Sequence, residues 1–209
     1  MRVSEIFYSL QGEGARAGDP SIFIRLSGCS AKHACVASGI VCDTEFESGQ
    51  EMTPEALLAQ IRGDYPCKWI VWTGGEPLDQ LTPEIVRYFR REGDYKQALE
   101  TSGIQSLAPF AAVTCAFDYI AVSPKVAEHV LIPRFPLRAD GTHVNELRYV
   151  RHRTQDIPVP SLKAHRYYLS PHTDGVEIPT MNLRHCIDLC LQHPSWSLSV
   201  QQHKQWLIL

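Results

Sequence analysis

Residues 21–44 read SIFIRLSGCSAKHACVASGIVCDT and join a strand pattern to a loop that is rich in cysteine. The β-branched and aromatic run at residues 21–26 ends at a Ser-Gly pair, which predicts a strand that leads directly into the loop. The loop contains three cysteines, Cys29, Cys35 and Cys42. Three thiolates are one fewer than a closed zinc site requires, whereas a [4Fe–4S] cluster held by three cysteines keeps one iron open to a small ligand. This loop is therefore the first candidate for the seat of the chemistry.

Strand and helix patterns alternate outward from this segment. Thr-Pro-Glu at residues 53–55 and again at residues 82–84 supplies an N-cap hydroxyl, a first-turn proline and a first-turn acid. The two helices predicted there end at Gly63 and Gly93, and a final helix is predicted over Met181–Gln192. Further strands are predicted at residues 69–72, 97–101, 119–122, 146–150, 167–169 and 197–200. The alternation predicts a mostly parallel α/β sheet in a single domain over residues 1–209.

The composition narrows the class of protein. The chain has 209 residues, 44% of them hydrophobic, and a formal net charge of −3. This balance predicts no nucleic-acid partner and no anionic membrane partner. The N-terminus lacks the apolar region of a signal peptide, and no window reaches the roughly 18 apolar residues of a membrane span. We therefore expect a cytoplasmic protein whose seven cysteines are free thiols or metal ligands rather than disulfides.

Polar or glycine-rich segments follow several of the predicted strands directly. They are the cysteine loop, Thr73–Glu76, Thr101–Gly103 and Ser123–Lys125. In parallel α/β folds the carboxyl ends of the strands meet at one edge, and ligands bind there. The sequence therefore predicts one site that is assembled from segments far apart in the chain.

Seven motifs in order give the chain a family resemblance. They are SLQGEG at residues 9–14, FIRLSGC at 23–29, CDT at 42–44, TGGEP at 73–77, ETSG at 100–103, SPK at 123–125 and SVQQHK at 199–204. With them the chain resembles the radical S-adenosylmethionine (SAM) enzymes and, among these, the 7-carboxy-7-deazaguanine synthase family of queuosine biosynthesis and tRNA modification. The resemblance runs almost end to end. It implies an incomplete (β/α) barrel of the radical SAM type, with a mostly parallel sheet and a reduced set of helices.

The activity that this resemblance implies is a radical ring contraction. The expected lyase converts 6-carboxy-5,6,7,8-tetrahydropterin to 7-carboxy-7-deazaguanine with loss of ammonia, on the way to 7-deazapurines. The expected cofactors are a [4Fe–4S] cluster, SAM and Mg²⁺. A flavodoxin-like electron donor and a homodimeric assembly are further expectations of the family.

The resemblance also implies roles for individual residues. The cluster ligands are Cys29, Cys35 and Cys42, and Thr44 supplies a hydroxyl to Mg²⁺, a hard cation that prefers oxygen ligands. The residues expected to contact SAM are Val41, Asp43, Gly74, Gly75, Glu76, Ser123, Pro124 and Lys125. The residues expected to contact the substrate are Leu10, Gln11, Gly12, Arg25, Thr73, His203 and Leu209. Arg25 suits the substrate carboxylate because guanidinium binds carboxylates in a bidentate fork. We expect Trp206, Leu207 and Ile208 to pack inward and to bring the α-carboxylate of Leu209 to the pterin.

The cysteine spacing departs from the family pattern. Five residues separate Cys29 from Cys35 and six separate Cys35 from Cys42, where the family usually has CxxxCxxC. Loop-closure entropy rises only slowly with length, so an enlarged cluster loop over residues 29–42 is tolerated. His33 is an alternative ligand to Cys35. The cysteines outside the loop are expected to pack in the core; they are Cys67, Cys115, Cys186 and Cys190.

Two other functions remain open from the sequence. Another radical SAM enzyme, such as a glycyl-radical activase, would use the same cluster and the same glycine-rich turn. A non-catalytic zinc-binding module would use the cysteines alone. The SLQGEG and SVQQHK segments favour the synthase, because the resemblance assigns both of them to substrate binding.

Overall fold

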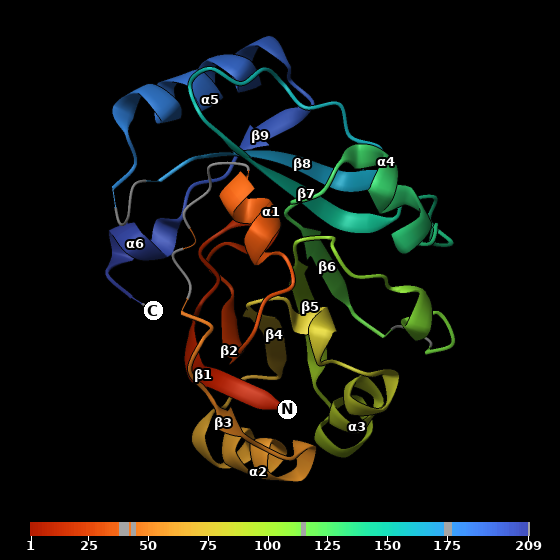
Figure 1. Cartoon of the computed structure of the whole chain (residues 1–209). Coiled ribbons are helices and arrows are strands. Elements are labelled where there is room, and N and C mark those ends of the chain that lie inside the picture. The colour runs from red at the N-terminus through yellow and green to blue at the C-terminus, as the bar shows by residue number, and fades with distance from the viewer. Residues whose placement is uncertain (38–41, 43–44, 114–115, 174–176, 209) are drawn as a thin grey trace.

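A computed structural model describes residues 1–37, 42, 45–113, 116–173 and 177–208 of the chain. The described residues form one nine-stranded sheet in the order β3-β1-β2-β4-β5-β6-β7-β8-β9 (Figure 1). The strands are β1 (Arg2–Leu10), β2 (Pro20–Leu26), β3 (Gln50–Glu51), β4 (Trp69–Gly74), β5 (Lys96–Thr101), β6 (Tyr119–Val122), β7 (Val144–Arg151), β8 (Ala164–Pro171) and β9 (Trp196–Leu198). The pairs from β2 to β9 are parallel, and β1 is antiparallel to both of its neighbours.

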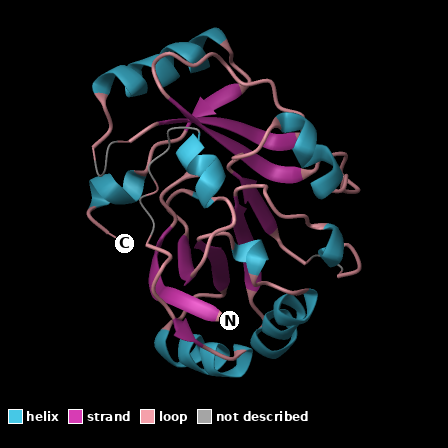
Figure 2. Cartoon of the chain, in the orientation of Figure 1, coloured by secondary structure: helices cyan, strands magenta, loops and turns pink. Residues whose placement is uncertain are grey.

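The described residues form few helices, and most of these lie around the outside of the sheet (Figure 2). They are α1 (Lys32–Ala37), α2 (Pro54–Asp64), α3 (Pro83–Gly93), α4 (Glu128–Leu131), α5 (Thr180–Gln192) and α6 (Gln202–Trp206). The hydroxyls of Thr53 and Thr82 cap α2 and α3 by accepting hydrogen bonds from the backbone N–H groups of Ala56 and Ile85 (3.2 and 3.4 Å). Between β5 and β6 the described residues form no helix longer than a 3-10 turn at Ala108–Phe110. An open, mostly parallel sheet with a reduced helix set confirms the predicted fold class.

The two faces of the sheet differ in their chemistry. Ile22, Ile24, Ile70 and Trp72 point into the main core with α2 and α3, and all four are fully buried. Alternate residues face the other way, where Phe7, Phe23, Val71 and Ala98 form a second, smaller apolar cluster. On that face the same strands continue toward their carboxyl ends with Arg25, Thr73 and Glu100. The face of the sheet that carries this second cluster is therefore apolar at one end of the strands and polar at their carboxyl ends.

The N-terminal and C-terminal segments differ from the sequence prediction. No strand was predicted over residues 2–10, yet β1 pairs with β2 along its length, with an irregular register near Ser4. The helix α5 is not the last, because α6 follows it. The prediction that the chain end packs inward is wrong for the described residues, since Trp206 and Ile208 are each 38% exposed and Leu207 is 90% exposed. The apolar composition of a terminal segment does not determine whether the rest of the fold offers a surface for it to pack against.

In the described part of the chain, no helix combines the length and the apolar character that a membrane crossing needs.

Candidate active site

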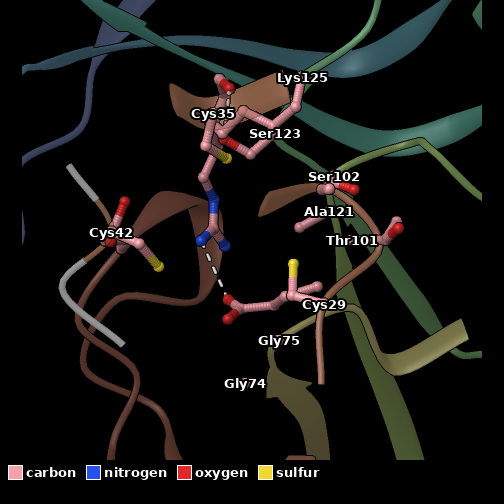
Figure 3. A pocket seen from close by; sticks show the side chains of 14 residues that line it. Cys29, Cys35, Cys42, Gly74, Gly75, Thr101, Ser102, Ala121, Ser123 and Lys125 are labelled. Carbon is pink, nitrogen blue, oxygen red and sulfur yellow. Dashed lines mark hydrogen bonds and ion pairs between the residues drawn. The ribbon is translucent and has the colours of Figure 1, made fainter. Parts of the chain in front are cut away.

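A cavity of about 220 Å³ opens where β2, β4, β5 and β6 end. Its lining joins all the segments that follow these strands, and Figure 3 shows the labelled side chains around it. The lining residues are Glu13, Cys29, Ala31, Cys35, Cys42, Gly74, Gly75, Glu100, Thr101, Ser102, Ala121, Ser123, Lys125 and Arg148. The structure thus brings three cysteines together with the ends of four strands, as the parallel topology predicts.

A second cavity of about 200 Å³ adjoins the first and shares Glu13, Cys35, Cys42, Ser123, Lys125 and Arg148 with it. Part of its wall consists of residues that sequence reasoning missed, namely Ser170, Pro171, His172 and Thr173, and Ser199 and Gln201 of the SVQQHK motif complete it. A signal for this wall exists in the sequence. A Ser-Pro pair ends β8 in the same way as a Ser-Pro pair follows β6, and both strands are parallel members of one sheet.

The cysteine loop fits a cluster in the kind and number of its donors. Cys29 and Cys35 are partly buried, and Cys42 is exposed at the mouth. Burial raises the pKa of the Cys29 thiol and of the Cys35 thiol. Among the described residues, no three His, Cys, Asp or Glu side chains are close enough together to chelate a metal as they stand. Binding of a cluster would therefore have to bring the three cysteine side chains closer together. The iron would favour the thiolate forms of these cysteines, whereas burial disfavours them.

His33, the alternative ligand, lies on the exposed side of α1. Cys35 lies on the same helix and lines both cavities, beside Ser123 and Lys125 (Figure 3). Burial lowers the pKa of Lys125, and the nearby Cys35 acts in the opposite direction. This placement favours Cys35 over His33 as the middle ligand.

The glycine-rich turn after β4 holds the segment around Cys29. The N–H of Gly75 donates to the carbonyl of Leu26 (2.9 Å), and the N–H of Glu76 donates to the carbonyl of Gly28 (3.1 Å). A Cβ on Gly75 would lie 2.6 Å from the carbonyl carbon of Gly28, far inside van der Waals contact. Only glycine therefore allows the two backbones to approach this closely.

Asp79 holds the other side of Cys29. Its carboxylate accepts hydrogen bonds from the N–H and from the hydroxyl of Ser30 (2.8 and 2.7 Å) and from the amide of Gln105 (2.7 Å). Gln80 donates to the carbonyl of Ser27 (2.6 Å). The residues before and after Cys29 are thus both anchored to the turn that follows β4.

Glu76 joins the ends of β4 and β5. It is fully buried and accepts hydrogen bonds from the hydroxyl of Thr101 (2.8 Å), the N–H of Ser102 (2.9 Å) and the N–H of Leu78 (3.2 Å). Burial raises the pKa of this carboxyl, and the donors act against that shift. These hydrogen bonds shape the turn that carries Gly74 and Gly75.

Gln11 and Thr73, two predicted substrate residues, meet at Glu100. The Gln11 amide and the Thr73 hydroxyl each donate to the Glu100 carboxylate at 3.0 Å, and Arg148 donates to it at the same distance. Burial opposes ionisation of Glu100, but the charge of Arg148 and these donors lower its pKa overall. Glu100 lines the cavity, so it presents an ionised carboxylate there. Sequence reasoning placed no role on Glu100 or Arg148.

The other predicted substrate residues lie outside the group of side chains that hydrogen-bond to Glu100. Arg25 forms an ion pair with Glu5 on β1, and its guanidinium lies over the ring of Phe7. His203 on α6 lies against Gly12, where a Cβ would come within 2.8 Å of the imidazole Cγ. Leu10 is 39% exposed at the end of β1.

The segment Ser123–Lys125 follows β6 directly. The N–H of Ser123 donates to the carbonyl of Thr101 (2.8 Å), and the Lys125 ammonium donates to the Ser123 hydroxyl (3.2 Å). Pro124 lines a third, smaller cavity beside the second. Four predicted site residues, Val41, Asp43, Thr44 and Leu209, and the core prediction for Cys115 lie outside the described residues.

Comparison with known proteins gives a consistent set of relatives. No family model matches the chain. The chain is 32% identical over 204 residues to a 7-carboxy-7-deazaguanine synthase from Bacteroides thetaiotaomicron, which covers 97% of this chain and 96% of the relative. It is 34% identical over 218 residues to a 7-carboxy-7-deazaguanine synthase from Burkholderia multivorans, with the same coverage. The crystal structure of QueE from Escherichia coli matches 96% of this chain and 93% of that chain, with a TM-score of 0.63 and 25% identity.

Proposed function

The chain belongs to the 7-carboxy-7-deazaguanine synthase family, and we propose that the two adjoining cavities are where it performs that reaction. It is a radical SAM lyase of queuosine biosynthesis that contracts the ring of 6-carboxy-5,6,7,8-tetrahydropterin to give 7-carboxy-7-deazaguanine. The resemblance read from the sequence motifs is thereby confirmed. The observation that supports the site most strongly is the meeting of three cysteines with the Gly74-Gly75 turn and with Ser123–Lys125 around one cavity.

The first cavity suits a [4Fe–4S] cluster with SAM beside it. Cys29, Cys35 and Cys42 are the proposed cluster ligands. When bound, the cluster and SAM together supply the 5′-deoxyadenosyl radical that takes a hydrogen atom from the substrate. The role of the protein is to position these groups and to exclude quenchers. Gly74 and Gly75 line the cavity without a side chain, which would let the amino group of SAM approach the backbone closely.

The second cavity suits the nucleoside part of SAM. Ser123, Lys125 and Ser170 supply polar groups there, and His172, whose ring stacks on His152, lines the same wall. Proposed SAM contacts also include Glu76, Pro124, Val41 and Asp43.

The substrate side is proposed to be the region around Glu100. Gln11 and Thr73 already hydrogen-bond to this carboxylate, and Gly12, Leu10 and His203 lie in the adjoining segments. Arg25 is the proposed partner of the substrate carboxylate. It pairs with Glu5 in this structure, so the substrate would have to replace Glu5 or share the guanidinium with it.

Three further assignments extend the proposal. Thr44 is the proposed protein ligand of Mg²⁺, which would also take substrate oxygens and water. A flavodoxin-like protein is the proposed electron donor, and Leu209 remains a proposed substrate contact. A homodimer is proposed as the assembly, and the exposed apolar side chains of Trp206, Leu207 and Ile208 are consistent with a covered surface there.

Anaerobic reconstitution and turnover test the function. The chain is loaded with iron and sulfide, reduced with dithionite, and incubated with SAM and the carboxytetrahydropterin. We expect a brown protein, 5′-deoxyadenosine, and a product whose mass corresponds to ring contraction with loss of ammonia. A colourless protein that retains only zinc would support the binding-module alternative. Cleavage of SAM without the ring-contracted product would point to another radical SAM reaction. The variant Thr44→Ala tests the metal assignment, because it should weaken the stimulation of turnover by Mg²⁺.

A further inference from the structure

A closed ring of hydrogen bonds lies behind the substrate side of the cavity. Gln11 donates to Glu100 (3.0 Å), and Arg148 donates to the same carboxylate oxygen (3.0 Å). The Nε of Arg148 donates in turn to Glu146. Glu146 accepts the backbone N–H of Ala15 (2.9 Å), which brings the ring back to the turn that began at Gln11. The ring therefore ties the turn after β1 to β5 and β7.

Arg148 is the cation that both carboxylates of the ring share. Glu146 is fully buried and Arg148 is only 8% exposed. The Tyr119 hydroxyl also donates to Glu146 (2.6 Å), but it brings no positive charge. A buried carboxylate that loses its cation is strongly destabilised, because it can neither keep its charge nor regain water. Arg148 therefore fixes the geometry of two acids at once.

The turn after β1 is shaped to meet Glu146. Gly14 has φ +68°, and a Cβ there would lie 2.6 Å from one carboxylate oxygen of Glu146. The N–H of Glu13 donates back to the side-chain oxygen of Gln11 (3.1 Å). One end of this turn is bound to Glu100 through Gln11, and the other end is bound to Glu146 through the N–H of Ala15. Arg148 contacts both of these carboxylates.

We propose that Arg148 is a positioning residue for substrate recognition, which sets the orientation of Glu100 and of the Gln11 turn. The proposal rests on the function given above, because it takes the region around Glu100 as the substrate side. Arg148 lines both cavities, but its two described side-chain ion pairs are both with carboxylates of the ring, Glu100 and Glu146. Its effect on the substrate is therefore transmitted through Glu100 and Gln11.

Glu146 makes the transmitted effect testable. It is fully buried behind the cavity wall, so a change at Glu146 can reach the substrate only through the ring. We compare Arg148→Met and Glu146→Gln with a matched control, Arg90→Met. Arg90 also forms a half-buried ion pair, with Asp118 (2.7 Å), but it lies on α3 at the opposite ends of the strands.

The readouts are the KM for the carboxytetrahydropterin, the Kd for SAM, and the iron content of the reconstituted holoenzyme. Arg148→Met should raise the substrate KM by about tenfold or more, because hydrogen bonds to charged groups are lost on the substrate side. Glu146→Gln should raise it by a smaller factor, and Arg148→Lys, which restores the charge, should recover part of the loss. SAM affinity and iron content should stay near parental values in Glu146→Gln, whose changed side chain is fully buried. In the two Arg148 variants they should fall by a smaller factor than substrate affinity, because Arg148 itself lines the cavities. Arg90→Met should lower stability and leave the KM unchanged.

The outcomes separate this inference from the proposed function. If the parent enzyme forms no ring-contracted product, the proposed function fails. If the parent turns over and Glu146→Gln keeps the parental KM, the inference is overturned and the function stands. An equal loss of SAM affinity and substrate affinity would also overturn it, since that pattern indicates general damage to the fold. If Arg148→Met does not fold, Glu146→Gln and Arg148→Lys decide the matter by the same criterion.

Discussion

Alanine in place of Gly75 should separate the glycine-rich turn from the cysteine loop. A Cβ there would lie 2.6 Å from the carbonyl carbon of Gly28 and 3.2 Å from the Cβ of Cys29. Carbon atoms pack comfortably at about 3.5–4.0 Å, so the Gly28 carbonyl would have to move by roughly 1 Å. That movement breaks the hydrogen bond from the N–H of Glu76 to Gly28 and displaces Cys29, the first of the proposed cluster ligands.

The expected cost follows from these two effects. Forcing an extra methyl group into a packed site costs about 1–3 kcal/mol, and leaving a buried N–H without its acceptor costs about 1–3 kcal/mol more. The free energy of unfolding should therefore fall by roughly 2–6 kcal/mol, which lowers Tm by roughly 4–24 °C in a chain of this size. SAM cleavage should fall by about 100-fold, because a shift of 1 Å at a reacting site has effects of that order.

Thermal unfolding, iron content after reconstitution and the rate of 5′-deoxyadenosine formation measure the three effects. Gly63→Ala is the matched control, because Gly63 lies in α2 and nothing is within 4 Å of its added Cβ. The control should keep its iron and gain about 0.5–1 kcal/mol from better helix propensity. A Gly75→Ala protein with parental Tm and iron content would refute the close approach on which this reasoning depends.

Three other changes test the site. Alanine at any of the three cavity cysteines should abolish iron retention while Cys186→Ala keeps it, and iron retained by Cys35→Ala but lost by His33→Ala would refute the ligand assignment. Asp79→Ala should speed iron loss to a chelator by roughly three- to tenfold, because the hydrogen bonds to Ser30 are lost; parental release kinetics would exclude an anchoring role. Arg148 and the other hydrogen-bond donors lower the pKa of Glu100 in the folded state. Ionisation of Glu100 therefore stabilises the fold at pH values above the unfolded-state pKa of about 4.3. This contribution is lost as the pH falls through the lower pKa of the folded state. Urea unfolding should therefore show the stability gap between the parent and Arg148→Met narrowing below about pH 4, and a constant gap would contradict that linkage.

The sequence by itself determined the sheet and the place of the site. Hydrophobic runs at 21–26 and 69–72 and the Thr-Pro-Glu starts of α2 and α3 are local signals, and each acts within a few residues of where it stands. Alternation of such elements gives parallel strands, and parallel strands finish at one edge. The cysteine loop, the Gly74-Gly75 turn and Ser123–Lys125 therefore had to meet.

The identity of the side chains that meet was decided only by the tertiary structure. Arg148 finds Glu100 because β7 and β5 lie on either side of β6 in one register, and no local pattern encodes a partner 48 residues away. Arg25 was assigned to a ligand from the sequence, yet Glu5 on the antiparallel strand β1 occupies it in this structure. The exposure of Leu207 likewise depends on what the rest of the fold leaves uncovered. Strand periodicity fixes which face a residue takes, whereas contacts across the sheet depend on strand order and register, which are properties of the assembled chain.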